Sequence, residues 1–174
     1  MTTKLSGLDN SVARAVFGAG CFWGSEAAFR RLSGVVDTRV GFMGDSRSGQ
    51  VVPVSDVHAH ELRHVEVVVV DFDPTRIDYG DLLEAFWKCH DSSVPAYDEN
   101  GKPDLVRSVI FAADDDQMST AQDALAAMPG TAVINTVVEQ VGHFHMARED
   151  QQRYLEKNEQ AVCSMKTSLA DAAE

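Results

Sequence analysis

The β-branched run at residues 63–72 constrains the fold of this chain more than any other feature. It reads VEVVVV over residues 65–70, is rich in strand-forming valine, and stops just before Pro74. Around it, apolar periodicity predicts six elements in the order strand, helix, strand, strand, helix, strand. Their ranges are about 12–17, 22–32, 35–42, 63–72, 79–89 and 106–111. This order predicts an α+β, two-layer fold with a ferredoxin-like β-α-β-β-α-β core, in which helices cover one face of a sheet.

Further segments are expected to decorate this core. Residues 44–62 and 91–102 are rich in turn-forming and polar residues and are predicted to be irregular. Beyond the core, we expect a helix at 114–128 with an acidic first turn, a strand at 131–141 and a polar helix at 147–158.

Length and composition fit one globular domain. We expect a single catalytic domain over residues 1–174, with its core at about 13–163 and a loose tail at 164–174. No apolar run reaches the length of a membrane span, and the first residues lack the apolar centre of a signal peptide, so we expect a cytoplasmic protein. A net charge of −12 argues against nucleic acid as a partner, because affinity for phosphates comes from Lys and Arg.

The sequence GCFWG at residues 20–24 joins the first predicted strand to the first predicted helix. Cys21 is therefore expected at the start of a helix, where unpaired N–H groups and the positive end of the helix dipole favour a thiolate. Phe22 and Trp23 place aromatic side chains beside this sulfur. An inert, buried cysteine is the plainer interpretation. A dinucleotide-binding loop is excluded, because the third glycine would come one place late, at Gly24, and the two aromatic residues would fill the pyrophosphate site.

Glu66 is the second candidate, because it is a carboxylate inside a run of valines. Burial raises the pKa of a carboxyl group, so a buried Glu66 could stay protonated near neutral pH and donate a proton. Strand alternation alone favours the opposite interpretation, in which Glu66 and His64 face water.

The six histidines fall into short clusters along the sequence. They are His58, His60, His64, His90, His143 and His145. Paired histidines can bind a metal, but no familiar zinc spacing is present, so we predict no metal site. Histidines that belong to loops, or that line a site with polar groups, are the favoured interpretation.

The three cysteines are widely spaced and odd in number, which does not suggest a disulfide framework. Cys89 lies in an apolar helical pattern beside Phe86 and Trp87 and is interpreted as a core residue. Cys163 follows the last predicted helix, where a thiol on a mobile tail could react with a distant sulfenic acid, or could simply be exposed.

Several short motifs occur in an order typical of one known family. They are GCFWG at 20–24, HVE at 64–66, FDP at 72–74, FWKCHD at 86–91, RS at 107–108, and YLEKN at 154–158 followed by Cys163. Together they resemble peptide methionine sulfoxide reductase type A, over about residues 13–163. The GCFWG motif is the most specific of the set.

The resemblance implies a role for each matching residue. Cys21 would attack the sulfoxide sulfur, Glu66 would protonate the departing oxygen, and Phe22 and Trp23 would enclose the S-methyl group. Cys163 would resolve the resulting sulfenic acid as a disulfide, which a thioredoxin-type reductant would reopen. The family acts on the S-epimer of methionine sulfoxide, free or in proteins, and needs no cofactor besides the thiol reductant.

The chain also departs from the family pattern around the sulfoxide oxygen. Counting from the motifs, valines stand where the family has tyrosines, and Gly101 stands where it has an aspartate, although a small shift would bring in Asp104. The valines are Val54, Val106 and Val162, and Arg63 replaces a glycine before the HVE motif. Losing one such oxygen-binding donor commonly costs about 10²–10³ in rate.

Two explanations follow from this departure. In the first, other polar groups bind the oxygen; the candidates are His58, His60, His64, His143, His145 and Tyr97. In the second, the pocket around Cys21 and Glu66 acts on another oxidised sulfur compound or another small substrate. A non-catalytic or metal-binding homologue is a third hypothesis.

Overall fold

The computed structural model describes residues 12–44, 64–97, 104–130 and 133–158. Their secondary structure is distributed along the chain as follows: β1 (Ala13–Ala19), α1 (Phe22–Arg30), β2 (Val35–Met43), β3 (Val65–Phe72), α3 (Tyr79–Cys89), β4 (Ser108–Ala112), α4 (Asp115–Ala126), β5 (Val137–Gln140), β6 (Phe144–Met146) and α5 (Tyr154–Lys157). The predicted β-α-β-β-α-β series is therefore present from β1 to β4, and the fold is α+β.

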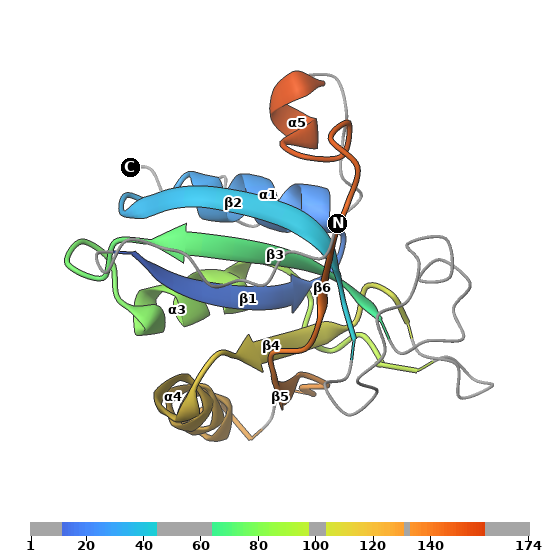
Figure 1. Ribbon diagram of the computed structural model, residues 1–174. Helices are drawn as coiled ribbons and strands as arrows, with labels where there is room; N and C mark the ends of the chain where they lie inside the picture. Colours follow the sequence, from blue (N-terminus) through green and yellow to red (C-terminus); the bar gives the residue numbers. More distant parts are fainter. Residues whose placement is uncertain (1–11, 45–63, 98–103, 131–132, 159–174) are drawn as a thin grey trace, which may run out of the picture.

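One mixed sheet carries all of these strands in the order β5-β4-β1-β3-β2-β6. Strand β3 lies antiparallel between β1 and β2, so β1 and β2 are parallel to each other. Helices α1 and α3 pack on the same face of the sheet (Figure 1). The C-terminal ends of β1 and β2 therefore lie beside the N-terminal ends of β3 and β6, along one edge of the sheet that runs across the strands. Helix α1 begins at this edge.

Both faces of the central strands are buried. On the helix-covered face, the ring of Phe17 stacks on Phe29 of α1 and on Phe86 of α3 at centroid distances of 5.0 and 5.4 Å. The opposite face has its own apolar cluster, which includes Val65, Val67, Val69, Val109 and Phe111. Burial on both faces explains why the β3 sequence is a continuous run of valines rather than an alternating one.

The last third of the described chain differs from the sequence prediction. The strand predicted at 131–141 is only the short β5, and the helix predicted at 147–158 is only the four-residue α5. Strand β6 was missed; it pairs with β2, where a Cβ added to Gly41 would lie 2.3 Å from the His145 carbonyl oxygen. Before α5, Arg153 adopts a left-handed conformation with φ of 51°, which interrupts any longer helix.

Some predictions concern residues outside the described part of the chain. Most of the irregular stretch 44–62 and the tail 164–174 lie there, so the domain boundaries stay a prediction. Within the described residues, no helix is long and apolar enough to cross a membrane.

Candidate active site

Cys21 lies at the start of α1, as the sequence predicted. Strand β1 ends at Ala19, Gly20 turns the chain with a φ of 74°, and Cys21 is the N-cap of the helix. The Cys21 carbonyl accepts the Gly24 N–H at 3.2 Å, and the thiol side chain is half-buried. The sulfur is thus carried at the positive end of a nine-residue helix and is not sealed in the core.

Glu66 reaches the same turn from β3. Its Oε2 accepts the backbone N–H of Phe22, the residue after Cys21, at 3.0 Å. Burial is the main influence on this half-buried carboxyl group and raises its pKa; the Phe22 N–H lowers it, and the nearby Asp104 raises it further. A carboxyl group whose pKa is raised by burial therefore lies beside the candidate nucleophile.

The alternation argument for Glu66 and His64 was wrong. Glu66 shares a strand face with Val68 and Val70, which belong to the helix-covered core, and His64 is buried. This face is covered by the start of α1 and by its neighbours, so it is not a solvent face.

Aromatic rings line the site on the α1 side. Phe22 is buried, with its ring centroid 5.7 Å from that of Phe42 on β2, while Trp23 is partly exposed. The indole of Trp23 stacks on Tyr154 at 3.9 Å and donates its Nε1–H to Gln151 at 3.1 Å. Sequence reasoning missed Tyr154 and Gln151, although Tyr154 opens the YLEKN motif that was noted.

A turn at Asp104 closes the site on the β4 side. Its Oδ1 accepts the Val106 N–H at 2.9 Å, and the following Leu105 carbonyl accepts the Glu66 N–H at 2.7 Å. The backbone N–H of Asp104 bonds the carbonyl of Ala96, the residue before Tyr97, at 3.0 Å. Asp104 thus lies close to Glu66, so it is placed to match the aspartate of the family pattern if the alignment is shifted by a few residues. Val106 lies beside Asp104 and is half-buried.

Three histidines come together at the same edge of the sheet. The ring centroid of His145 lies 5.2 Å from that of His64 and 4.7 Å from that of His143. Burial, and then the neighbouring side chains of His145, Arg107 and His143, lower the pKa of His64 to about 4, so it is neutral at pH 7. Nδ1 of His64 and Nε2 of His145 are buried without a hydrogen-bond partner among the described residues.

His90 is separate from this group. Its Nδ1 lies 2.7 Å from the Phe86 carbonyl, which fixes Nδ1 as the donor, and its Nε2 lies 2.7 Å from the Ser108 hydroxyl. In the described part of the chain, no group of three or more histidine, cysteine or acidic residues is arranged to hold a metal.

The remaining residues considered from the sequence are a core residue, a surface residue and several that lie outside the described chain. Cys89 is a core residue, as predicted: it is 4% exposed, and burial raises the pKa of its thiol to about 12. Tyr97 is 47% exposed. The remaining predicted residues, His58, His60 and Cys163, lie outside the described residues, as do Val54, Arg63, Gly101 and Val162.

Comparison with known proteins identifies the family. A model of the peptide methionine sulfoxide reductase family matches residues 13–174. The chain belongs to this family. It is 39% identical over 161 residues to peptide methionine sulfoxide reductase MsrA of Methanothermobacter thermautotrophicus, which covers 90% of this chain and 94% of the relative. The resemblance inferred from the sequence motifs is thereby confirmed.

Solved structures give the same result for the fold. Reduced Mxr1 from Saccharomyces cerevisiae has a TM-score of 0.78 and 27% identity, over 92% of this chain and 93% of Mxr1. Mxr1 solved in complex with Trx2 has a TM-score of 0.60 at 22% identity, over 93% and 94% of the two chains, and shares the fold.

Proposed function

We propose that this chain reduces methionine-S-sulfoxide, free or in peptides, to methionine with Cys21 as the nucleophile. The observation that carries the proposal is the contact between Glu66 and the Phe22 N–H, because it brings a protonatable carboxyl group to the turn that bears Cys21. Family membership supports the choice of substrate.

The chemistry balances with these two groups. The Cys21 thiolate attacks the sulfoxide sulfur and forms an S–S bond, while Glu66 gives a proton to the sulfoxide oxygen. The hydroxyl then transfers from the substrate sulfur to the Cys21 sulfur as the S–O and S–S bonds of the substrate sulfur break. Methionine leaves as the reduced product, and Cys21 is left as a sulfenic acid. The aromatic rings of Phe22 and Trp23 pack against the S-methyl group and exclude water from the reacting sulfur.

The second half of the cycle regenerates the thiol. Cys163 attacks the sulfenic sulfur, releases water and forms a disulfide with Cys21. A thioredoxin-type thiol then reduces the disulfide, and no other cofactor is needed. Support for this reductant comes from the shared family and from Mxr1, whose structure was solved with Trx2. A reductant of this kind fits the reducing cytoplasm.

A different oxidised-sulfur substrate is the second candidate. It is favoured by Val106, a half-buried apolar residue next to the Asp104 turn, where the family pattern has a hydroxyl donor. If methionine sulfoxide is the substrate, its oxygen must accept from other donors, and we propose the ring N–H groups of His64 and His145 for this role.

Thiol counting tests the proposed function directly. Protein is incubated with methionine-S-sulfoxide and no reductant, and methionine formed is compared with thiols lost. We expect two thiols lost per methionine, none lost in Cys21→Ala, and an unchanged ratio of two in the control Cys89→Ala. Absence of methionine, with Cys21 still open to alkylation, would contradict this substrate and favour the second candidate.

A further inference from the structure

The segment 147–158, here called the C-terminal segment, is attached to the core by buried polar contacts. The side-chain amide of Gln152, which is 8% exposed, accepts the Val40 N–H at 2.8 Å. The same amide donates to the carbonyls of Val40 and Ala147 at 2.9 and 3.0 Å. Gln152 thus pairs with the backbone N–H and carbonyl of Val40, just beyond the part of β2 that pairs with β6. Both polar atoms of the Gln152 side chain are hydrogen-bonded.

The neighbouring contact is made by Glu26, a residue of α1 that is only 1% exposed. Its Oε2 accepts the backbone N–H of Arg153 at 2.7 Å, and its Oε1 accepts the Thr38 hydroxyl at 3.0 Å. Arg153 is the residue with the left-handed backbone. The carboxylate therefore holds the segment at the point where the chain turns into α5.

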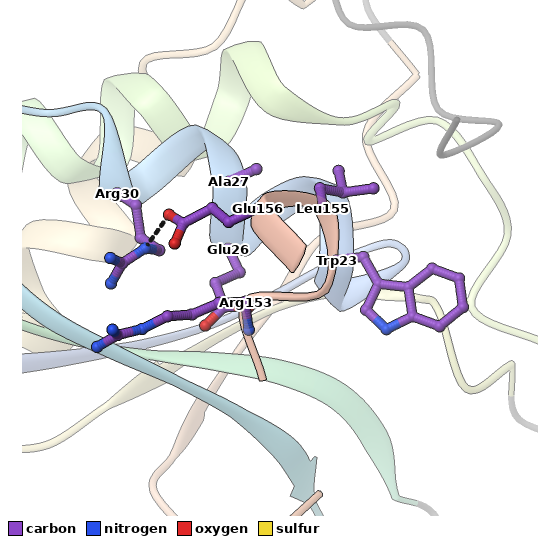
Figure 2. Close-up of a pocket in the computed structure, with 7 residues that line it drawn as sticks. All are labelled: Trp23, Glu26, Ala27, Arg30, Arg153, Leu155 and Glu156. Carbon is purple, nitrogen blue, oxygen red and sulfur yellow. Dashed lines mark hydrogen bonds and ion pairs between the residues drawn. The ribbon is translucent and has the colours of Figure 1, made fainter. Parts of the chain in front are cut away.

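The residues on either side of this turn both touch Trp23. Gln151 accepts the indole N–H, and the ring of Tyr154 stacks on the indole with an interplanar angle of 13°. Trp23 lies three residues before Glu26 on α1, so the two share a helix face. In Figure 2, Glu26 of α1 lies beside Arg153 of the C-terminal segment, and Trp23 extends from the same helix.

The buried Glu26 is paired from several sides. Burial raises its pKa, while the Arg153 N–H, the Thr38 hydroxyl and the charge of Arg30 act in the opposite direction. Removal of this side chain would leave the Arg153 N–H without its acceptor. The neighbouring contacts of Gln152 and the exposed ion pair between Arg153 and Asp37 do not replace that acceptor.

We propose that Glu26 is a positioning residue: it fixes the turn at Arg153, and through Gln151 and Tyr154 this turn sets the orientation of the Trp23 indole. This inference rests on the proposed function, in which Trp23 is the wall that receives the substrate methyl group. Glu26 is expected to act on substrate binding through that wall, not on the chemical step.

The test uses three substitutions in a Trp87→Phe background, so that Trp23 is the only tryptophan. Glu26→Ala removes the acceptor. Glu26→Gln keeps one oxygen for the Arg153 N–H and can donate to Thr38, so it is the conservative rescue. Glu156→Gln is the matched control. Glu156 belongs to the same C-terminal segment, and its substitution removes the exposed ion pair with Arg30 of α1.

We expect Glu26→Ala to raise KM for methionine-S-sulfoxide about 10-fold, with kcat changed less than about 3-fold. The emission of Trp23 should shift to longer wavelength and its acrylamide quenching should rise at least about 2-fold. Glu26→Gln and Glu156→Gln should stay within about 2-fold of the parent in each measurement. If Glu26→Ala does not fold, Glu26→Asp, which is too short to reach Arg153, replaces it with the same expected results.

Two outcomes would overturn the proposal. One is a folded Glu26→Ala protein whose Trp23 emission and KM match those of the parent. The other is a fall in kcat with KM and emission unchanged, which would place Glu26 in the chemical step. The fluorescence measurement needs no turnover, so it still tests the positioning role if the parent protein does not reduce methionine sulfoxide.

Discussion

Cys21 and Cys89 lie in similar sequences but in opposite environments. Each is close to a Phe-Trp pair in sequence. Cys21 directly precedes Phe22-Trp23, and Cys89 follows Phe86-Trp87 with one residue between them. Cys21 caps the start of α1 and is half-buried, whereas Cys89 is the last residue of α3 and is 4% exposed. The thiol of Cys89 lies 3.4 Å from the Phe86 carbonyl, to which it donates.

The difference lies in two factors, the position of each cysteine on its helix and the burial of its thiol. The start of a helix presents N–H groups and positive potential, and the end presents carbonyls and negative potential. At the end of α3, burial raises the pKa of Cys89 to about 12, so its thiol is protonated at any physiological pH. Aromatic neighbours alone therefore do not mark a reactive cysteine.

The largest expected effect separates the two cysteines by activity. Cys21→Ala should lower the rate of methionine-S-sulfoxide reduction by at least about 10³-fold, because it removes the atom that attacks the substrate. Cys89→Ala should keep the rate within about 2-fold. Steady-state assays with dithiothreitol as the reductant measure both. Comparable losses in the two folded variants would mean that the contrast between them is not catalytic.

A second prediction concerns Glu66, which distinguishes the Cys21 region from that of Cys89. Glu66→Gln should lower kcat by about 10²–10⁴-fold, the usual contribution of a general acid. Because Glu66 acts in its protonated form, activity of the parent should fall as pH rises through its raised pKa. A pH series of kcat/KM measures this, and the descending limb should be absent from Glu66→Gln. An unchanged rate and pH profile in a folded variant would remove the acid role.

The same pKa shift has a consequence for stability. The folded protein binds the Glu66 proton more tightly than the unfolded chain does, whose carboxyl pKa is near the ordinary value of 4.5. The stability that this carboxyl contributes is fully present below pH 4.5 and is lost as pH rises through the folded pKa. Urea unfolding at several pH values should show a smaller decrease over this range for Glu66→Gln than for the parent.

The local parts of this architecture could be predicted from sequence, and the long-range parts could not. Elements β1 to β4 follow from apolar periodicity and from glycine and proline at their ends, and Cys21 was placed correctly by the strand-turn-helix pattern around it. The C-terminal segment was predicted as one polar helix. Its conformation depends instead on contacts of Gln152 with Val40 and of Arg153 with Glu26, far away in sequence.

The candidate active site also divides into local features that the sequence predicts and long-range contacts that it does not. Alternation predicted that Glu66 faces water, because the sequence of β3 does not reveal which face α1 covers. The family motifs corrected this, since they pair the HVE sequence with GCFWG. Tyr154 was not predicted as part of the aromatic wall, because stacking on Trp23 brings together residues from opposite ends of the described chain.

The smallest expected effect is on the free energy of unfolding. Here Cys89 should matter more than Cys21, the reverse of their expected effects on activity. Cys89→Ala should lower the free energy of unfolding by about 1–2 kcal/mol, because it removes a fully buried sulfur and leaves a small cavity against Phe86 and its neighbours. Cys21→Ala should change it by less than about 0.5 kcal/mol, since the thiol is partly exposed at a helix start. Urea denaturation followed by circular dichroism measures both values. Equal losses would mean that Cys21 also supports the core; a loss for Cys89 alone would establish that one cysteine serves packing while the other is left accessible for chemistry.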